Sequence, residues 1–225
     1  KEKTASAEYK LKHTRPLEPT EAVEKSNYDE CRTNYLKNNA QILKKLKLPW
    51  NDKAMDDMLG VGIRRDEKKK LQLVFRIADD HVKYHKGSQY GSAKCKVYPS
   101  PFSIGPCSTL LLCEGEKDVV TAHCHGANAA TFTSGAGAVP EDLTVLDEYN
   151  NIVIAYDNDE KGIEGAKKTA SALFKNGRKV SIVEWNGEPE KYDITDYLKY
   201  NSIDSLWKLA VPFGDDPVDL GGMPS

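Results

Sequence analysis

Acidic residues follow three of the predicted strands in an order that suits the binding of divalent cations. Glu114 stands directly after an apolar run in LLLCEGEKD, and Asp157 and Asp159 stand after another in NIVIAYDNDEKG. Asp193 and Asp196 follow a third run, in EKYDITDYL. Such a group of like charges is costly unless cations neutralise it, and Mg²⁺ prefers oxygen ligands. The pattern therefore predicts a metal site.

An alternative interpretation of these acids is purely structural. Asp157 and Asp159 are two residues apart, so both side chains point to the same side of an extended chain. The same residues also suit an exposed loop, in which Asp159 or Glu160 caps the helix that follows. The loop explains any single acid adequately. The ordered combination of a glutamate, an Asp-x-Asp pair and a third acid favours the metal site.

The elements that must position these acids are strands alternating with helices. Apolar runs predict strands over residues 109–113, 129–133, 151–156 and 179–185, with helices over 119–126 and 163–174. This alternation is typical of a parallel α/β sheet flanked by helices. In such a sheet, ligands bind beyond the carboxyl ends of the strands, where the acids lie.

The residues before this region predict a smaller α+β subdomain. Helical spacing covers residues 28–47 and 51–58. Alternation then indicates a strand over 71–76, a turn at Asp79 and Asp80, and a return strand over 81–85. We expect a flexible arm at 1–27, this subdomain at 28–106, the parallel domain at 107–205 and a linker or tail at 206–225.

The charge divides at the same boundary. Residues 1–106 carry 22 Lys and Arg against 14 Asp and Glu, whereas residues 107–225 carry 10 against 20. The net charge of −2 hides this division. A basic front half favours a polyanionic partner, and an acidic back half favours cations.

Four segments together resemble the TOPRIM domain of bacterial- and phage-type DNA primases. They are CEGEKDVVTA, TFTSGAGA, IVIAYDNDEKGIEGAKKTASAL and YDITDYL. The resemblance implies that Glu114, Asp157 and Asp159 are catalytic and, with Asp193, bind Mg²⁺ or Mn²⁺ in a two-metal arrangement. Tyr192 stands where phage primases have a lysine, so the match is weakest there.

The implied activity is that of a primase catalytic core, a nucleotidyltransferase. Such a protein would make short RNA primers from NTPs on a single-stranded DNA template. A replicative helicase, fused or separate, is a further expected partner. Two alternatives stay open: a metal-dependent TOPRIM nuclease, and a non-catalytic module that binds nucleic acid.

Basic residues in the front half are candidates for holding phosphates. The set consists of Arg76, Lys83, Lys86, Lys94 and Lys96, with Tyr84, Tyr90 and Tyr98 interleaved. Lysines with aromatic residues suit contacts to phosphates and stacked bases, although a solvated surface has the same composition. Lys117, three residues after Glu114, either reaches a phosphate or simply begins a helix.

Other features narrow the class of protein. The five cysteines are odd in number and irregularly spaced, which argues against a disulfide scaffold. The arrangement of Cys113, His123, Cys124 and His125 differs from that of paired zinc knuckles, so no zinc is expected. We see no signal peptide, membrane span or Walker A motif. The chain is expected to be cytoplasmic and, because it begins without Met, to be a piece of a longer protein.

Overall fold

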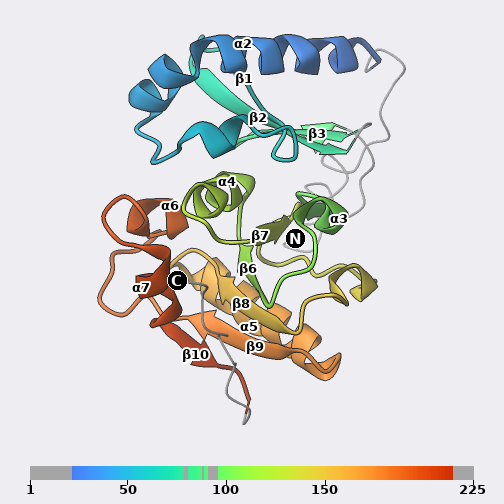
Figure 1. Ribbon diagram of the computed structural model, residues 1–225, viewed down its shortest axis with the longest axis vertical. Coiled ribbons are helices and arrows are strands. Elements are labelled where there is room, and N and C mark those ends of the chain that lie inside the picture. Colours follow the sequence, from blue (N-terminus) through green and yellow to red (C-terminus); the bar gives the residue numbers. More distant parts are fainter. Residues whose placement is uncertain (1–21, 79–80, 88, 91–95, 215–225) are drawn as a thin grey trace, which may run out of the picture.

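The computed structural model describes residues 22–78, 81–87, 89–90 and 96–214, and its front part is a four-stranded sheet covered by a long helix (Figure 1). The sheet is antiparallel and has the order β1-β2-β3-β4. The strands of this sheet are β1 (Val61–Arg65), β2 (Leu71–Ala78), β3 (His81–Tyr84) and β4 (Gln89–Tyr90). The helices of the front part are α2 (Ala22–Leu46) and the 3₁₀ helix η2 (Asp52–Met55). The helix predicted over 28–47 and the hairpin are present, whereas the helix predicted over 51–58 is only the 3₁₀ helix η2, and strand β1 was not predicted. The predicted turn at 79–80 lies outside the described residues.

Helix α2 lies close to strand β1 because of a glycine. A Cβ atom on Gly62 would stand 3.0 Å from the Cβ of Cys31 and 3.1 Å from its carbonyl carbon. A side chain at this position would therefore push the helix away from the sheet. Arg32 reinforces the contact, because its guanidinium donates to the carbonyl oxygen of Val61 over 2.8 Å.

The back part is a six-stranded sheet with a parallel centre. Its order is β10-β9-β8-β6-β7-β5; β6 to β9 run parallel, and the edge strands β5 and β10 are antiparallel. The strands are β5 (Val97–Tyr98), β6 (Thr109–Cys113), β7 (Ala129–Phe132), β8 (Asn151–Ala155), β9 (Lys179–Val183) and β10 (Ala210–Pro212). The helices are α3 (Pro101–Ile104), α4 (Glu116–Cys124), η3 (Thr144–Leu146), α5 (Glu160–Lys175), α6 (Ile194–Tyr197) and α7 (Ile203–Trp207). The predicted α/β class is confirmed.

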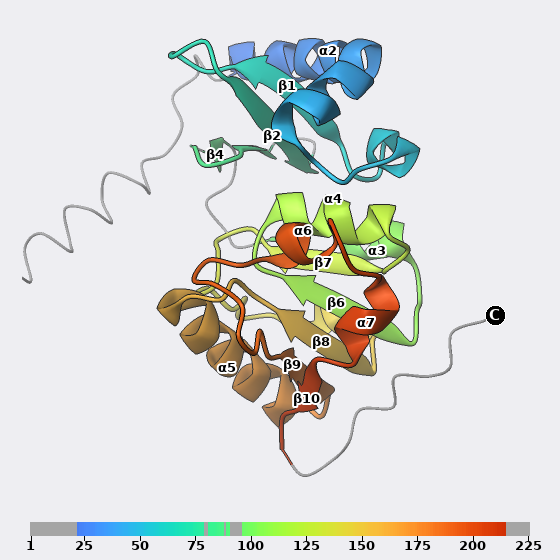
Figure 2. The same ribbon diagram turned by 90° about the vertical axis from the view of Figure 1, so that its left-hand side faces the viewer.

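The large sheet is buried on both faces, which explains its continuous apolar strands. Leu111 and Cys113 of β6 pack with α4, whereas Leu110 and Leu112 pack with α5. Figure 2 shows α4 on the face toward the front part and α5 on the opposite face. The cluster on the α4 side also includes Phe75 of β2, so the two parts share one hydrophobic core.

Three boundaries differ from those expected. Helix α2 begins at Ala22, so residues 22–27 are helical rather than part of the arm. Strand β5 pairs with β7, so the large sheet begins before residue 107. Strand β10 pairs with β9, so residues 210–212 belong to the sheet rather than to a tail. Short edge strands carry little periodicity, which is why sequence reasoning missed them.

Within the described residues, no helix combines the length and apolar character that crossing a membrane requires.

Candidate metal centre at the strand ends

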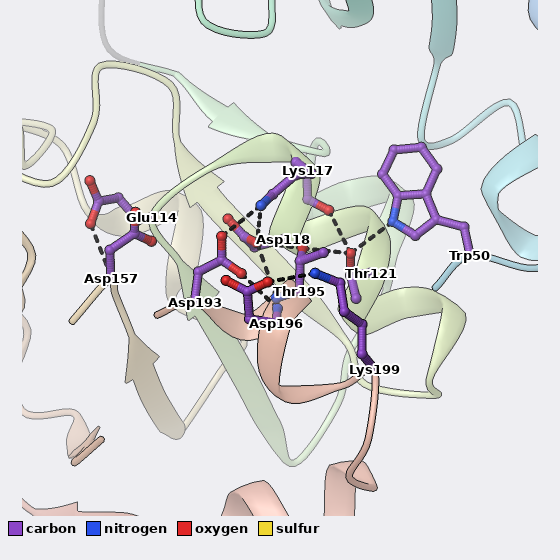
Figure 3. Close-up of polar contacts among 10 residues, drawn as sticks. All are labelled: Trp50, Glu114, Lys117, Asp118, Thr121, Asp157, Asp193, Thr195, Asp196 and Lys199. Carbon is purple, nitrogen blue, oxygen red and sulfur yellow. Dashed lines mark hydrogen bonds and ion pairs between the residues drawn. The ribbon is translucent and has the colours of Figure 1, made fainter. Parts of the chain in front are cut away.

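Three carboxylates converge beside the carboxyl ends of β6 and β8. Asp118, Asp157 and Asp193 each offer an oxygen atom, and these atoms all lie within 4.8 Å of one another (Figure 3). Asp118 lies in the first turn of α4, Asp157 follows β8, and Asp193 is the N-cap of α6. This all-oxygen donor set fits a hard divalent cation.

Glu114 borders this group through the backbone. Its Oε2 accepts a hydrogen bond from the backbone N–H of Asp157 over 3.1 Å. Burial raises the pKa of Glu114, and the nearby Asp159, Asp118 and Asp193 add to the rise. The glutamate is therefore at the edge of the same electrostatic cluster.

Asp159 has a different position from the one expected of a ligand. It is the N-cap of α5, and its Oδ1 accepts a hydrogen bond from the backbone N–H of Gly162 over 2.8 Å. A Cβ atom on Gly162 would stand only 2.1 Å from the carbonyl oxygen of Asp157, so glycine permits this tight entry into the helix. Among the described residues, the converging group of three includes Asp118, which was not predicted, and includes neither Asp159 nor Glu114.

The sequence offered one signal for Asp118. It stands four residues after Glu114 in EGEKD, in the first turn of the helix that leaves the strand end. That position sends its carboxylate back toward the strand ends, because helical side chains tilt toward the helix N-terminus. Because the helix was predicted to begin at residue 119, Asp118 was placed outside it and was not considered as a ligand.

Two of these three carboxylates, those of Asp157 and Asp118, have raised pKa values. Burial is the main cause for Asp157, followed by the charges of Asp118 and Glu114, and its pKa rises to about 8. Burial likewise raises the pKa of Asp118, although the Lys117 charge opposes the rise. These carboxylates are thus costly to ionise together unless a cation is bound.

Lys117 is joined to the acids. Its Nζ lies 2.6 Å from Oδ2 of Asp193 and 3.5 Å from Oδ1 of Asp118. Burial alone would lower the pKa of Lys117, but these two carboxylates outweigh it and raise that pKa. Lys117, which was predicted either to reach a phosphate or to begin a helix, therefore stands in the first turn of α4 beside the acidic cluster and offsets part of its charge.

Lys83 is also held by protein groups. Its Nζ lies 2.7 Å from Oε1 of Glu116 and 2.8 Å from the carbonyl oxygen of Thr133. Because Glu116 is only 4% exposed, this ion pair is largely shielded from water. The contact ties strand β3 of the front part to helix α4 of the back part.

The other predicted basic residues are more dispersed. Lys86 is exposed, and so is Arg76, whose guanidinium carbon lies 5.5 Å from the centre of the Tyr28 ring. Lys96 is half-buried, and its backbone N–H donates to Oγ1 of Thr133 over 3.0 Å. Lys94 lies outside the described residues.

His85 is a residue near the acids that sequence reasoning did not single out. Burial, followed by the positive charges of Lys117, Lys86 and Lys83, lowers the pKa of this histidine to about 4. The charge of Asp193 opposes the effect. The end of β3 therefore lies near the acidic cluster, a proximity that only the tertiary arrangement reveals.

Residues 111–198, which contain the acidic strand ends, match the Toprim-like family. A curated relative, the DNA primase of Geobacillus stearothermophilus, is 36% identical over 84 residues, which are 36% of this chain and 14% of that protein. The predicted resemblance to the TOPRIM domain of DNA primases is thereby confirmed. The aligned region is only a small part of the relative.

Solved primase structures share the fold over a longer stretch. The E. coli primase catalytic core has a TM-score of 0.59 at 14% identity, covering 84% of this chain and 79% of that one. A DnaG primase catalytic domain bound to ssDNA has a TM-score of 0.56 at 15% identity, covering 84% of this chain and 81% of that one. The similarity extends beyond the Toprim-like segment into the front part, because its coverage exceeds that segment.

Proposed function

We propose that this chain is the catalytic core of a DNA primase, a nucleotidyltransferase that joins NTPs into short RNA primers on single-stranded DNA. The observation that carries the proposal is the convergence of Asp118, Asp157 and Asp193 at the strand ends. The relatives named DNA primase and the fold shared with primase catalytic cores support it. The likeness to a primase domain bound to ssDNA supports the choice of template.

Asp118, Asp157 and Asp193 would hold Mg²⁺ or Mn²⁺, with Glu114 at the border of the site. When bound, these ions would neutralise triphosphate charge and favour attack by a primer 3′-hydroxyl on the α-phosphate, with pyrophosphate leaving. We retain Asp159 as a candidate for catalysis, although its capping contact gives it a structural role as well.

The protein's own groups would position the reactants. Lys117 keeps the acids partly compensated when a cation is absent, which limits their repulsion. Lys86 and Arg76 are exposed cations on the front part, and they suit the phosphates of a template or nucleotide. Positioning and charge stabilisation supply most of the catalysis in phosphoryl-transfer chemistry of this kind.

The test is a primer-synthesis assay on single-stranded DNA with labelled NTPs and either Mg²⁺ or Mn²⁺. We expect oligoribonucleotides whose formation requires both the template and the metal. An Asp193→Asn variant is expected to lose them, whereas the exposed Asp204→Asn variant serves as the matched control. The absence of NTP-dependent products from the wild-type chain contradicts the proposal.

A parallel incubation distinguishes the two alternatives. Cleavage of labelled DNA or RNA with Mg²⁺ and without NTPs supports a nuclease, in which metal ions held by the same acids would activate water. Binding of nucleic acid with neither cleavage nor synthesis supports a non-catalytic module. The partnership with a replicative helicase stays a prediction from the sequence.

A further inference from the structure

A chain of hydrogen bonds leads from the front part of the molecule to one carboxylate of the metal centre (Figure 3). Nε1 of Trp50 donates to Oγ1 of Thr121 over 2.7 Å. The hydroxyl oxygens of Thr121 and Thr195 are 2.9 Å apart, and Oγ1 of Thr195 donates to Oδ1 of Asp118 over 2.6 Å. Each link has the length of a good hydrogen bond.

All four side chains are shielded from water. Trp50 is 7% exposed, Thr121 0%, Thr195 3% and Asp118 5%. They come from three separate segments: Trp50 from the stretch before η2, Asp118 and Thr121 from helix α4, and Thr195 from helix α6. A buried polar group that loses its partner is costly, so these contacts constrain one another strongly.

The chemistry of the groups gives the chain a direction. The indole N–H of Trp50 can only donate, and an ionised carboxylate can only accept. Since Thr195 gives its one hydroxyl proton to Asp118, the link to Thr121 is completed when Thr121 donates to Thr195. The hydroxyl of Thr121 also donates to the carbonyl oxygen of Lys117 over 3.0 Å, so this carbonyl and the hydroxyl oxygen of Thr195 share the one proton of Thr121.

We propose that Trp50, Thr121 and Thr195 are positioning residues that orient the Asp118 carboxylate for cation binding. We call the chain of hydrogen bonds from Trp50 through Thr121 and Thr195 to Asp118 the relay. Oδ1 of Asp118 is contacted by the hydroxyl of Thr195, by the backbone N–H of Thr195 and by Nζ of Lys117. This inference rests on the proposed function only in taking Asp118 as a cation ligand. It adds that the front part, through Trp50, sets the orientation of that ligand.

The attachment of the segment around Trp50 to helix α4 favours a positioning role for Trp50. Its neighbour Asn51 donates from Nδ2 to the carbonyl oxygen of Cys124 over 2.7 Å, at the opposite end of α4 from Asp118. The segment is thereby held against α4 at two points. A shift of the front part relative to α4 would move the Trp50 N–H and disturb the whole chain of bonds.

The test measures Mn²⁺ affinity of the full chain by electron paramagnetic resonance, without NTPs or template. Thr195→Val removes the bond to Asp118 and is expected to weaken Mn²⁺ binding roughly tenfold, as loss of an outer hydrogen bond to a metal ligand typically does. Trp50→Phe keeps an aromatic side chain but removes the N–H donor together with the five-membered part of the indole, and a smaller loss of roughly twofold to fivefold is expected. Thr195→Ser retains the hydroxyl and should restore the affinity.

The matched control is Trp207→Phe. Nε1 of Trp207 is buried and has no hydrogen-bond partner among the described residues, so its removal breaks no such bond. This variant should bind Mn²⁺ as the wild type does. An equal loss in Trp207→Phe and Trp50→Phe would overturn the proposal, because it would reflect general loosening of the core.

A double-variant comparison separates a relay from independent packing effects. Once Thr195→Val has interrupted the series of hydrogen bonds, Trp50→Phe should cause no further loss of Mn²⁺ affinity. An undiminished effect of Trp50→Phe in that background overturns the relay. If Thr195→Val does not fold, the wild-type indole N–H resonances decide: Mg²⁺ should shift the signal of Trp50 and leave that of Trp207 in place, and an unmoved Trp50 signal overturns the proposal.

The readouts also distinguish this proposal from the proposed function. A wild-type chain that binds Mn²⁺ in a Trp50-dependent way but makes no primer supports the relay and refutes the primase. A chain that makes primers with unchanged Mn²⁺ affinity in Trp50→Phe and Thr195→Val overturns the relay alone. A wild type that binds no Mn²⁺ overturns both.

Discussion

The acidic strand ends and the basic front part were both predicted from residue type, yet the two sets meet different environments in the folded chain. Asp157 and Asp193 lie together as expected, and Asp118 joins them. Of the predicted basic residues, Lys83 of the front part contacts a buried glutamate, and Lys117 of helix α4 in the back part contacts the acids themselves.

This difference has a physical origin. The location of a strand-end acid follows from topology, because parallel strands deliver their carboxyl ends to one edge. The partner of a long lysine depends on which side chains the tertiary fold brings within its reach. The sequence therefore predicts where acids gather better than it predicts which anion each cation meets.

The largest effect we predict separates two acids that the sequence treats alike. Asp157→Asn should reduce primer synthesis roughly hundredfold or more, because a group that stabilises developing charge is lost. Asp159→Asn retains a residue that caps helices as well as aspartate does, so the fold should be preserved. Rates of primer synthesis and urea unfolding curves are measured for both variants.

The Asp159 result decides between its two roles. If Asp159 acts only through its contact with Gly162, the asparagine variant should keep primer synthesis within about threefold of wild type. A loss as large as that of Asp157→Asn, with unchanged stability, would make Asp159 a functional carboxylate, as the TOPRIM resemblance implies.

The second prediction concerns Lys83 as a link between the two parts. Lys83→Met leaves Glu116 buried without its partner, so the free energy of unfolding should fall by about 3 kcal/mol. Adding Glu116→Leu should recover much of that loss. The exposed pair Lys199–Asp196 is the control, since Lys199→Ala should cost no more than about 0.5 kcal/mol.

The same variants test whether Lys83 also binds nucleotide. A role in phosphate binding alone would raise the KM for NTPs in Lys83→Met while leaving the urea unfolding curve unchanged. That outcome would contradict the linking role. It would also mean that the sequence predicted the role of this basic residue as well as it predicted the roles of the acids.

Particular residues show where sequence reasoning stops. The four central strands were found from their apolar runs, and Glu114 and Asp157 from their places after those runs. Asp118 and His85 were missed for different reasons: the helix start was placed too late for the first, and no sequence pattern shows that β3 faces the acids. The Trp50–Thr121 contact joins residues that are 71 positions apart, so only packing reveals it.

The third prediction is a pH dependence that belongs to the acidic centre. Asp157 has a pKa of about 8 in the folded chain without a cation, so it retains a proton at neutral pH. A cation must displace that proton, and Mn²⁺ affinity should therefore rise by up to roughly tenfold per pH unit between about pH 6 and about pH 8. Above that range the dependence on Asp157 should level off.

Titration calorimetry in two buffers with different ionisation enthalpies measures the protons released on Mn²⁺ binding. Asp157→Asn should bind Mn²⁺ more weakly and with a smaller pH dependence. Equal affinity at both ends of the pH range in the wild type would show that Asp157 is not among the ligands.

The smallest predicted effect tests the basic side through Lys86, an exposed lysine at the end of the β3 region. If Lys86 contacts a template phosphate, Lys86→Gln should weaken binding of single-stranded DNA and reduce the slope of log affinity against log salt by about 0.7. Lys175→Gln is the matched control, because that lysine ends α5 on the face of the large sheet opposite the front part. Fluorescence anisotropy over a salt series measures both slopes.

Equal slopes for Lys86→Gln, Lys175→Gln and wild type would show that the template binds elsewhere. A reduced slope in Lys86→Gln alone would show that the front part contacts a polyanion, as its charge predicts.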